Sequence, residues 1–135
     1  VCYDIEFGID IKEVAKKNKL TVKALIASHT EQEYLVYMLG FTPGFMYLGG
    51  MEGIECPRKE TPRLKIKAGA VGIAGTQTGV YPIESPGGWQ IIGRTPSLIF
   101  DKRNSENHFL VEQGDYVQFY SISKKEFNLL NQHHD

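Results

Sequence analysis

Apolar positions at helical spacing mark the first part of the chain. Asp10 followed by Glu13 is spaced as a capping pair, and the apolar residues behind it fall on one helix face: Ile11, Val14 and Ala15. Thr21 stands before a second apolar face and predicts a short capped helix. Two short helices are therefore expected before residue 33.

A nearly continuous apolar run follows, EYLVYMLGF at residues 33–41. Its richness in β-forming residues predicts a strand buried on both faces. Near the end of the chain, FLVEQGDYVQFYSI predicts two strands around a turn at residues 113–115, with Val117 and Phe119 facing away from Tyr116 and Tyr120. The SKKE stretch after it predicts a capping box and a last helix.

Glycine and proline are concentrated in the middle of the chain. Residues 40–96 hold twelve of the fourteen glycines and all six prolines. Short apolar runs such as AVGIAG and WQIIG alternate there with turns, which is typical of a sandwich or barrel. In SPGGWQIIGRTP, turns bound both ends of a strand that contains the single tryptophan, Trp89. The alternative, low-complexity disorder, is disfavoured by the regular apolar runs and frequent aromatics. The fold class is therefore mainly β.

Length and charge limit the functional classes. The 135 residues correspond to one domain, and a net charge of −1 gives no reason to expect nucleic acid or an anionic membrane as partner. No apolar run approaches the roughly 20 residues that span a bilayer. The first residue is Val1, not Met, so we expect a piece of a longer protein. Cys2 and Cys56 form no CxxC motif, which favours a cytoplasmic protein over a disulfide scaffold.

Several kinds of chemistry lack their sequence signals. His133 and His134 are adjacent at the end of the chain, where a solvated surface is expected, and no His/Cys cluster suggests a metal site. Cys56 is a possible nucleophile without a base nearby, so a small buried hydrophobe is favoured. GAVGIAGTQTG lacks the lysine of a phosphate-binding loop and predicts a strand and a tight turn instead.

A basic, glycine-rich region offers the best candidate site. Six basic and two acidic residues lie between Pro57 and Thr95. Arginine binds carboxylates through its planar fork, and glycine lets a ligand approach the backbone. We therefore expect one concave site for a small carboxylate, with these substrate-binding residues: Arg58, Arg63, Gln77, Tyr81 and Arg94. The alternative is that the arginines brace the loops, which is slightly favoured for Arg94.

A second candidate surface is apolar. In GFTPGFMYLGG, proline and glycine interrupt a run of aromatic residues that cannot all alternate into one sheet. We expect part of this segment to be exposed and to contact a partner protein, through these residues: Phe41, Pro43, Phe45, Met46 and Tyr47. Packing in the core is the alternative.

Three stretches resemble one known family. They are YLVYMLGFTPGFMYLGG, PRKETPRLKIKAGAVGIAGTQTGVYP and SPGGWQIIGRTP, and they resemble the C-terminal domain of the family that holds KipI, allophanate hydrolase subunit 1 and the 5-oxoprolinase B subunit. The likeness covers nearly the whole chain. It implies a single cyclophilin-like domain over residues 1–135, built as a closed β-barrel with two or three short helices. Members carry a separate N-terminal domain.

The resemblance also implies two competing functions. In the first, the chain belongs to a 5-oxoprolinase that uses ATP and Mg²⁺ in the assembled complex to convert 5-oxo-L-proline to L-glutamate. Its partners are a homologous cyclophilin-like C subunit, together with the A subunit, and the isolated domain is expected to be inactive. In the second, the chain inhibits the autophosphorylation of a sporulation sensor histidine kinase. The resemblance alone assigns no catalytic residue.

Overall fold

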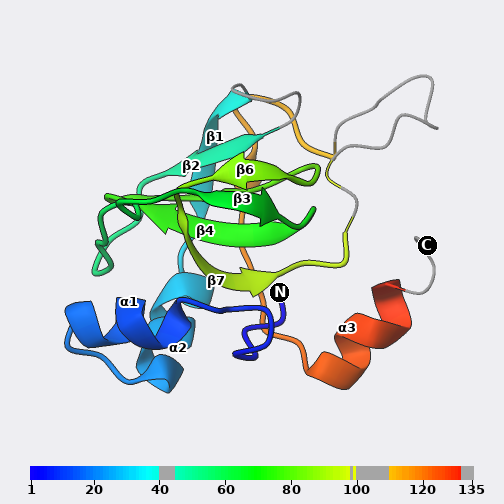
Figure 1. Cartoon of the computed structure of the whole chain (residues 1–135). Coiled ribbons are helices and arrows are strands. Elements are labelled where there is room, and N and C mark those ends of the chain that lie inside the picture. The colour runs from blue at the N-terminus through cyan, green and yellow to red at the C-terminus, as the bar shows by residue number, and fades with distance from the viewer. Residues whose placement is uncertain (40–44, 98, 100–109, 132–135) are drawn as a thin grey trace.

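The structure is a computed structural model that describes residues 1–39, 45–97, 99 and 110–131. Three helices and eight strands are described, and Figure 1 shows their arrangement. The helices are α1 (Ile11–Lys17), α2 (Val22–Glu31) and α3 (Lys124–Asn131). The strands are β1 (Tyr34–Leu39), β2 (Met46–Gly49), β3 (Arg63–Ile66), β4 (Ala70–Ala74), β5 (Gln77–Val80), β6 (Ser85–Gly87), β7 (Gln90–Arg94) and β8 (Tyr116–Val117).

The strands form two antiparallel sheets. The larger has the order β7-β4-β5-β2-β1-β8, and β3 pairs with β6 in a separate two-stranded ribbon. The predicted mainly β class with short helices is confirmed. Among the described strand pairings, none joins β7 to β8, so the closed cyclophilin-like barrel stays a prediction.

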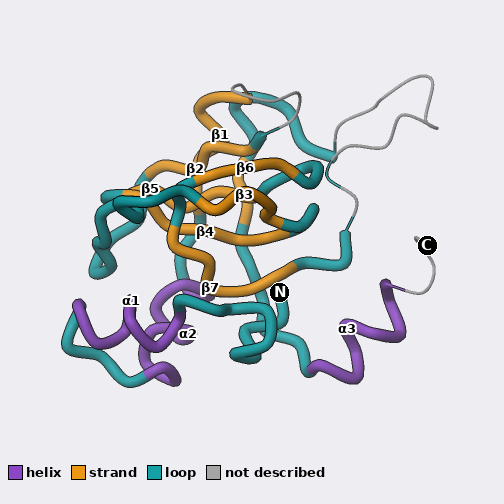
Figure 2. The backbone as a smooth tube through the Cα atoms, viewed as in Figure 1, coloured by secondary structure: helices purple, strands orange, loops and turns teal. Residues whose placement is uncertain are grey.

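The large sheet has a different cover on each of its two faces. The inner face packs against α1 and α2, through a core that includes Val14, Leu25, Leu48 and Ile73. The outer face carries a second cluster, which contains Phe45, Ile66, Ala70, Ala74, Tyr81, Trp89 and Ile91. Figures 1 and 2 show α1 and α2 on one side of the sheet, with α3 well apart from them beside the N-terminal segment.

Sequence patterns predict a structural feature correctly where that feature depends on residues that are close together in the chain. The capping box before α3 is present: the Ser123 hydroxyl accepts from the Glu126 N–H at 3.1 Å, and the Glu126 carboxylate accepts from the Ser123 N–H at 3.2 Å. The predicted strand and tight turn are β4 and β5, joined through Gly75, whose φ of 62° favours glycine. The strand predicted around the single tryptophan is present as β7, but Trp89 itself lies just before it, and residues 85–87, expected as a turn, form β6.

Some local predictions are wrong. Of the two strands expected around the turn at residues 113–115, only β8 is formed among the described residues, because residues 110–112 lie outside any strand. β1 is buried on one face only, because Tyr34 and Val36 point into the core while Leu35 and Tyr37 stay partly exposed. The ribbon packs elsewhere on the sheet, since Ile66 of β3 belongs to the cluster that contains Ala70 of β4 and Ile91 of β7. Asp10 precedes α1 but makes no side-chain cap. Its carboxylate is used in a tertiary contact instead.

Candidate functional site

An aromatic pocket lies on the outer face of the large sheet. Its volume is about 240 Å³, and it is lined by Phe45, Tyr47, Arg58, Lys59, Pro62, Tyr81, Gly87, Gly88 and Trp89. These residues come from the segments around β2 and β6 and from the loop before β3. The site therefore lies between the sheet and the ribbon.

Glycines form the floor on which Trp89 rests. A Cβ placed at Gly72 would lie 3.0 Å from the Trp89 Cβ, and one at Gly79 would lie 2.9 Å from the indole ring and 2.7 Å from the Met46 carbonyl oxygen. Because Gly72 and Gly79 pair across β4 and β5, the two missing side chains leave one flat area. The indole fills this area, and Trp89 remains only 6% exposed.

Aromatic rings surround the indole. Phe45 is the centre of the cluster, with ring centroids 5.2 Å from Trp89, 4.9 Å from Tyr81 and 4.6 Å from Tyr47. The contacts with Trp89 and Tyr81 are edge-to-face, which is a favoured geometry for aromatic pairs. Such walls exclude water, and a charge-assisted hydrogen bond at their rim is stronger than it would be in bulk solvent.

Arg58 supplies a positive charge at this pocket. Its guanidinium carbon lies 5.9 Å from the centroid of the Trp89 ring, a cation–π distance. Among the described residues, no carboxylate forms an ion pair with Arg58. Burial raises the pKa of Tyr81, although a backbone hydrogen bond from Trp89 and the charge of Arg58 act against the rise. The phenol therefore stays neutral and can donate a hydrogen bond.

The predicted substrate-binding residues do not gather in one pocket. Arg58 and Tyr81 line the aromatic pocket, whereas Arg63 and Arg94 line a different one of about 190 Å³. Gln77 lines neither, and its side-chain oxygen accepts a 2.6 Å hydrogen bond from the Tyr37 hydroxyl. Of the five residues, the structure brings only Arg58 and Tyr81 together in the aromatic pocket, and substrate binding by any of them stays a prediction.

Two of the arginines brace the structure, in agreement with the alternative interpretation. Arg63 makes two hydrogen bonds to the Asp10 carboxylate, of 2.5 and 2.7 Å. Arg94 donates from Nε to the Ala68 carbonyl at 2.9 Å and lies over the Phe127 ring at 5.4 Å. These contacts tie the ribbon and α3 to the rest of the fold.

The described part of the apolar segment is mostly buried. Phe45 and Met46 are 1% and 2% exposed, so both belong to the core and not to an exposed contact surface. Tyr47 is half-buried at the aromatic pocket. Phe41 and Pro43 lie outside the described residues, and their role as partner contacts stays a prediction.

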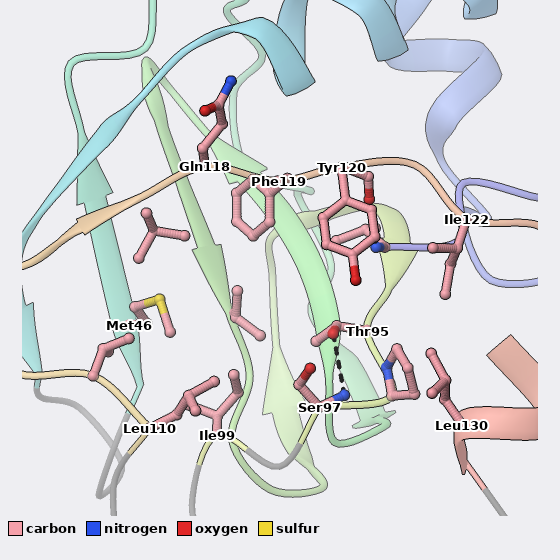
Figure 3. A pocket seen from close by; sticks show the side chains of 15 residues that line it. Met46, Thr95, Ser97, Ile99, Leu110, Gln118, Phe119, Tyr120, Ile122 and Leu130 are labelled. Atoms are coloured by element: carbon pink, nitrogen blue, oxygen red, sulfur yellow. Dashed lines mark hydrogen bonds between the residues drawn. The ribbon is translucent and has the colours of Figure 1, made fainter. Parts of the chain in front are cut away.

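A third pocket, of about 180 Å³, is lined in part by residues of the inner core cluster, among them Met46, Ile99 and Phe119 (Figure 3). Side chains from distant segments surround it, among them Met46, Phe119, Tyr120 and Leu130. The Ser97 N–H donates to the Thr95 hydroxyl at 3.2 Å along its rim. Its lining is mainly apolar, and we assign no chemistry to it.

Other reactive groups lie away from these pockets. Cys56 is a free, buried thiol, and burial raises its pKa, which agrees with the role of a small hydrophobe. In the described part of the chain, no three His, Cys, Asp or Glu side chains gather as a metal site. No helix among the described residues is long and apolar enough to cross a bilayer.

Sequence reasoning missed the most important parts of the site. The motif around Trp89 indicates only a strand. The glycines that pack against the indole, Gly72 and Gly79, lie in a different stretch of the sequence. The role of Asp10 has no local signal, because its partner Arg63 is 53 positions away.

Comparison with known proteins decides the family. Residues 1–111 match the family model described as "Carboxyltransferase domain, subdomain C and D". The chain belongs to this family. The resemblance seen in the sequence motifs is thereby confirmed.

Relatives and a solved structure support the assignment. The chain is 56% identical over 130 residues to the 5-oxoprolinase B subunit of Bacillus subtilis (strain 168). This match covers 95% of this chain and 53% of that protein. It is 49% identical over 120 residues to the 5-oxoprolinase B subunit of Haemophilus influenzae, with 88% and 56% covered. The crystal structure of PH0987 from Pyrococcus horikoshii superposes with a TM-score of 0.89 at 55% identity, over 94% of this chain and 59% of that one. The chain thus spans about half the length of the curated relatives that it matches.

Proposed function

We propose that this member of the carboxyltransferase subdomain C and D family is part of a 5-oxoprolinase subunit. In this role it binds 5-oxo-L-proline in the aromatic pocket, while the assembled complex converts it to L-glutamate with ATP. The names of its relatives support the activity, and the pocket supports the substrate. The proposed partners are a cyclophilin-like C subunit, together with the A subunit. We also propose that this domain forms a closed cyclophilin-like barrel, as its homologous C subunit does.

The observation that carries the proposal is the place of Arg58. Its guanidinium lies over Trp89 at the rim of a pocket with aromatic walls, and no described carboxylate pairs with it. A small flat ring fits against aromatic faces, and a carboxylate on that ring accepts two parallel hydrogen bonds from the guanidinium. 5-Oxo-L-proline combines such a ring with a carboxylate.

The proposal divides the work between this chain and its partners. Arg58 binds the carboxylate, the neutral Tyr81 hydroxyl is available to an acceptor on the ring, and the aromatic walls exclude water. The described residues contain no carboxylate cluster that fits Mg²⁺, so we assign no ATP or metal ligand to this chain. The cytoplasm is the proposed compartment. The names of the relatives do not favour the kinase-inhibitor alternative.

The test is turnover by the complex of all three subunits, with this domain inside its full-length protein. Arg58→Met should raise KM for 5-oxo-L-proline by roughly ten- to a hundredfold, the value of one charge-assisted contact. Lys65→Met is the control, because Lys65 is an exposed cation outside the aromatic pocket. An unchanged KM in Arg58→Met would refute the proposed substrate site.

A further inference from the structure

The Asp10 carboxylate is a buried charge with several contacts. The residue is 4% exposed, and Arg63 binds both of the carboxylate oxygens. The backbone N–H of Ile91 donates to it at 2.7 Å, and Lys59 Nζ lies 3.6 Å away. Burial alone would raise the pKa of Asp10, but the hydrogen bonds from Arg63 and Ile91 and the charges of Arg63 and Lys59 hold it below its usual value. Asp10 is therefore ionised in this site.

These contacts join three elements that are distant in sequence. Asp10 stands directly before α1, Ile91 lies in β7, and Arg63 opens β3 of the ribbon. A buried carboxylate that is satisfied by several donors fixes their relative positions, since moving any one of them leaves a charge or a polar group unpaired. Asp10 thus attaches the ribbon to the edge of the large sheet.

The loop before β3, residues 57–63, is held at several points. The Lys59 N–H donates to the Gly88 carbonyl at 2.7 Å, and the Gln90 side chain donates to the Pro57 carbonyl at 3.1 Å. The Lys59 and Arg63 side chains both reach Asp10. Arg58 lies between these attachment points, and its own side chain is exposed at the aromatic pocket.

We propose that Asp10 is a positioning residue. By binding Lys59 and Arg63 it fixes the 57–63 loop, and the fixed loop places Arg58 at the aromatic pocket. The identity of the ligand rests on the proposed function, whereas the fixing of the loop is inferred from the structure alone. It also assigns different roles to adjacent cations. Lys59 also lines the aromatic pocket, but its Nζ lies 3.6 Å from the Asp10 carboxylate and its role is structural. Arg58 has no ion pair with a described carboxylate and is left to bind an anion.

Asp10→Asn separates positioning from simple electrostatics. The substitution keeps the size of the side chain and removes one negative charge near the pocket. If only net charge matters, an anionic ligand should bind more tightly to the variant. If Asp10 positions the loop, the ligand should bind more weakly in spite of the added positive charge.

The first readout needs no ligand. Amide hydrogen exchange of this chain, followed by NMR, measures the protection of the Lys59 N–H that is bonded to Gly88. In Asp10→Asn, the protection of this amide should fall by about tenfold or more, as for loss of a charge-assisted hydrogen bond, while that of Val80 in β5 changes little. Ile73→Val removes one buried methylene on the inner face and is the matched control for general loss of stability. Unchanged Lys59 protection in Asp10→Asn would overturn the proposal.

The second readout is ligand affinity, from the fluorescence of the single tryptophan during titration with 5-oxo-L-proline. Asp10→Asn should weaken binding about tenfold, and Ile73→Val should not. Tighter or equal binding by Asp10→Asn contradicts positioning. If the unmodified chain does not bind 5-oxo-L-proline, the proposed function fails, and the exchange of Lys59 still decides the role of Asp10. Should Asp10→Asn not fold, Arg63→Lys keeps the charge, loses the paired bonds, and must show the same selective loss at Lys59.

Discussion

At the scale of single residues, a buried histidine joins α2 to the sheet. His29 Nδ1 lies 2.6 Å from the Tyr3 hydroxyl, and Nε2 lies 2.9 Å from the Thr78 hydroxyl. The Thr78 hydroxyl donates its only proton to the Gly72 carbonyl, so it must accept from His29 Nε2–H. Nδ1 consequently accepts from Tyr3. The network is satisfied only by the neutral Nε2–H tautomer.

This tautomer makes stability depend on pH. Burial lowers the pKa of His29 from 6.5 to about 3, so the unfolded chain binds a proton that the folded chain excludes. The stability contributed by neutral His29 is complete above pH 6.5 and is lost as the pH falls toward 3, by roughly 1.4 kcal/mol per unit in the steep range. His29→Gln keeps a donor and an acceptor without titrating. Denaturant melts between pH 7 and 5 should show a drop for the unmodified chain and a much smaller one for His29→Gln, and equal slopes would contradict this account.

Phe45 tests whether the apolar segment belongs to the core. The side chain is 1% exposed and contacts three other rings, so Phe45→Ala should lower the free energy of unfolding by about 3–5 kcal/mol. Tyr47→Ala, at a half-buried position, is the comparison and should lower the free energy of unfolding by less than Phe45→Ala does. If thermal melts show Phe45→Ala to be nearly neutral, the segment is not core and the surface interpretation is the better one.

At the scale of elements, glycines in β4 and β5 determine where the aromatic pocket forms. Gly72 and Gly79 leave the outer face flat, and the indole of the segment before β7 lies against it. The ribbon then covers this part of the sheet, and Asp10 fixes the ribbon through Arg63. The pocket thus depends on contacts between elements more than on any one loop.

Gly79→Ala tests this view. The added methyl would lie 2.7 Å from the backbone oxygen of Met46 and 2.9 Å from the Trp89 ring, and backbone cannot move aside cheaply. We expect a loss of about 1–3 kcal/mol of stability, together with a red shift of Trp89 fluorescence as the indole becomes exposed. Gly88→Ala is the control, since its nearest neighbour would be 3.7 Å away, an ordinary contact. A variant at Gly79 with unchanged stability and emission would disprove the role of the glycine floor.

Sequence patterns predict the elements better than the site. The capping box of Ser123 and Glu126 is predictable because both partners lie within one helical turn. Asp10 has the same local spacing to Glu13, but a tertiary ion pair with Arg63 takes the carboxylate instead. The arginines share a basic region in the sequence and yet separate into different pockets, since side-chain direction depends on how the ribbon folds over the sheet.

At the scale of the whole molecule, the proposed function assigns substrate binding to this chain and the conversion to the assembled complex. The purified chain should therefore show no conversion of 5-oxo-L-proline with ATP and Mg²⁺, measured as glutamate formation. The full-length protein that contains this domain, mixed with the A and C subunits, should form glutamate under the same conditions. Turnover by the chain alone, free of the other subunits, would contradict this division of work.

The most direct test of the proposed site is a titration of the chain with 5-oxo-L-proline, followed by the fluorescence of its only tryptophan. 2-Pyrrolidinone, which has the same lactam ring without the carboxylate, is the matched ligand. The account predicts a saturable change with 5-oxo-L-proline that is at least about tenfold weaker with 2-pyrrolidinone, and a loss of this preference in Arg58→Met. Equal affinity for the two ligands, or a preference that survives Arg58→Met, would contradict it.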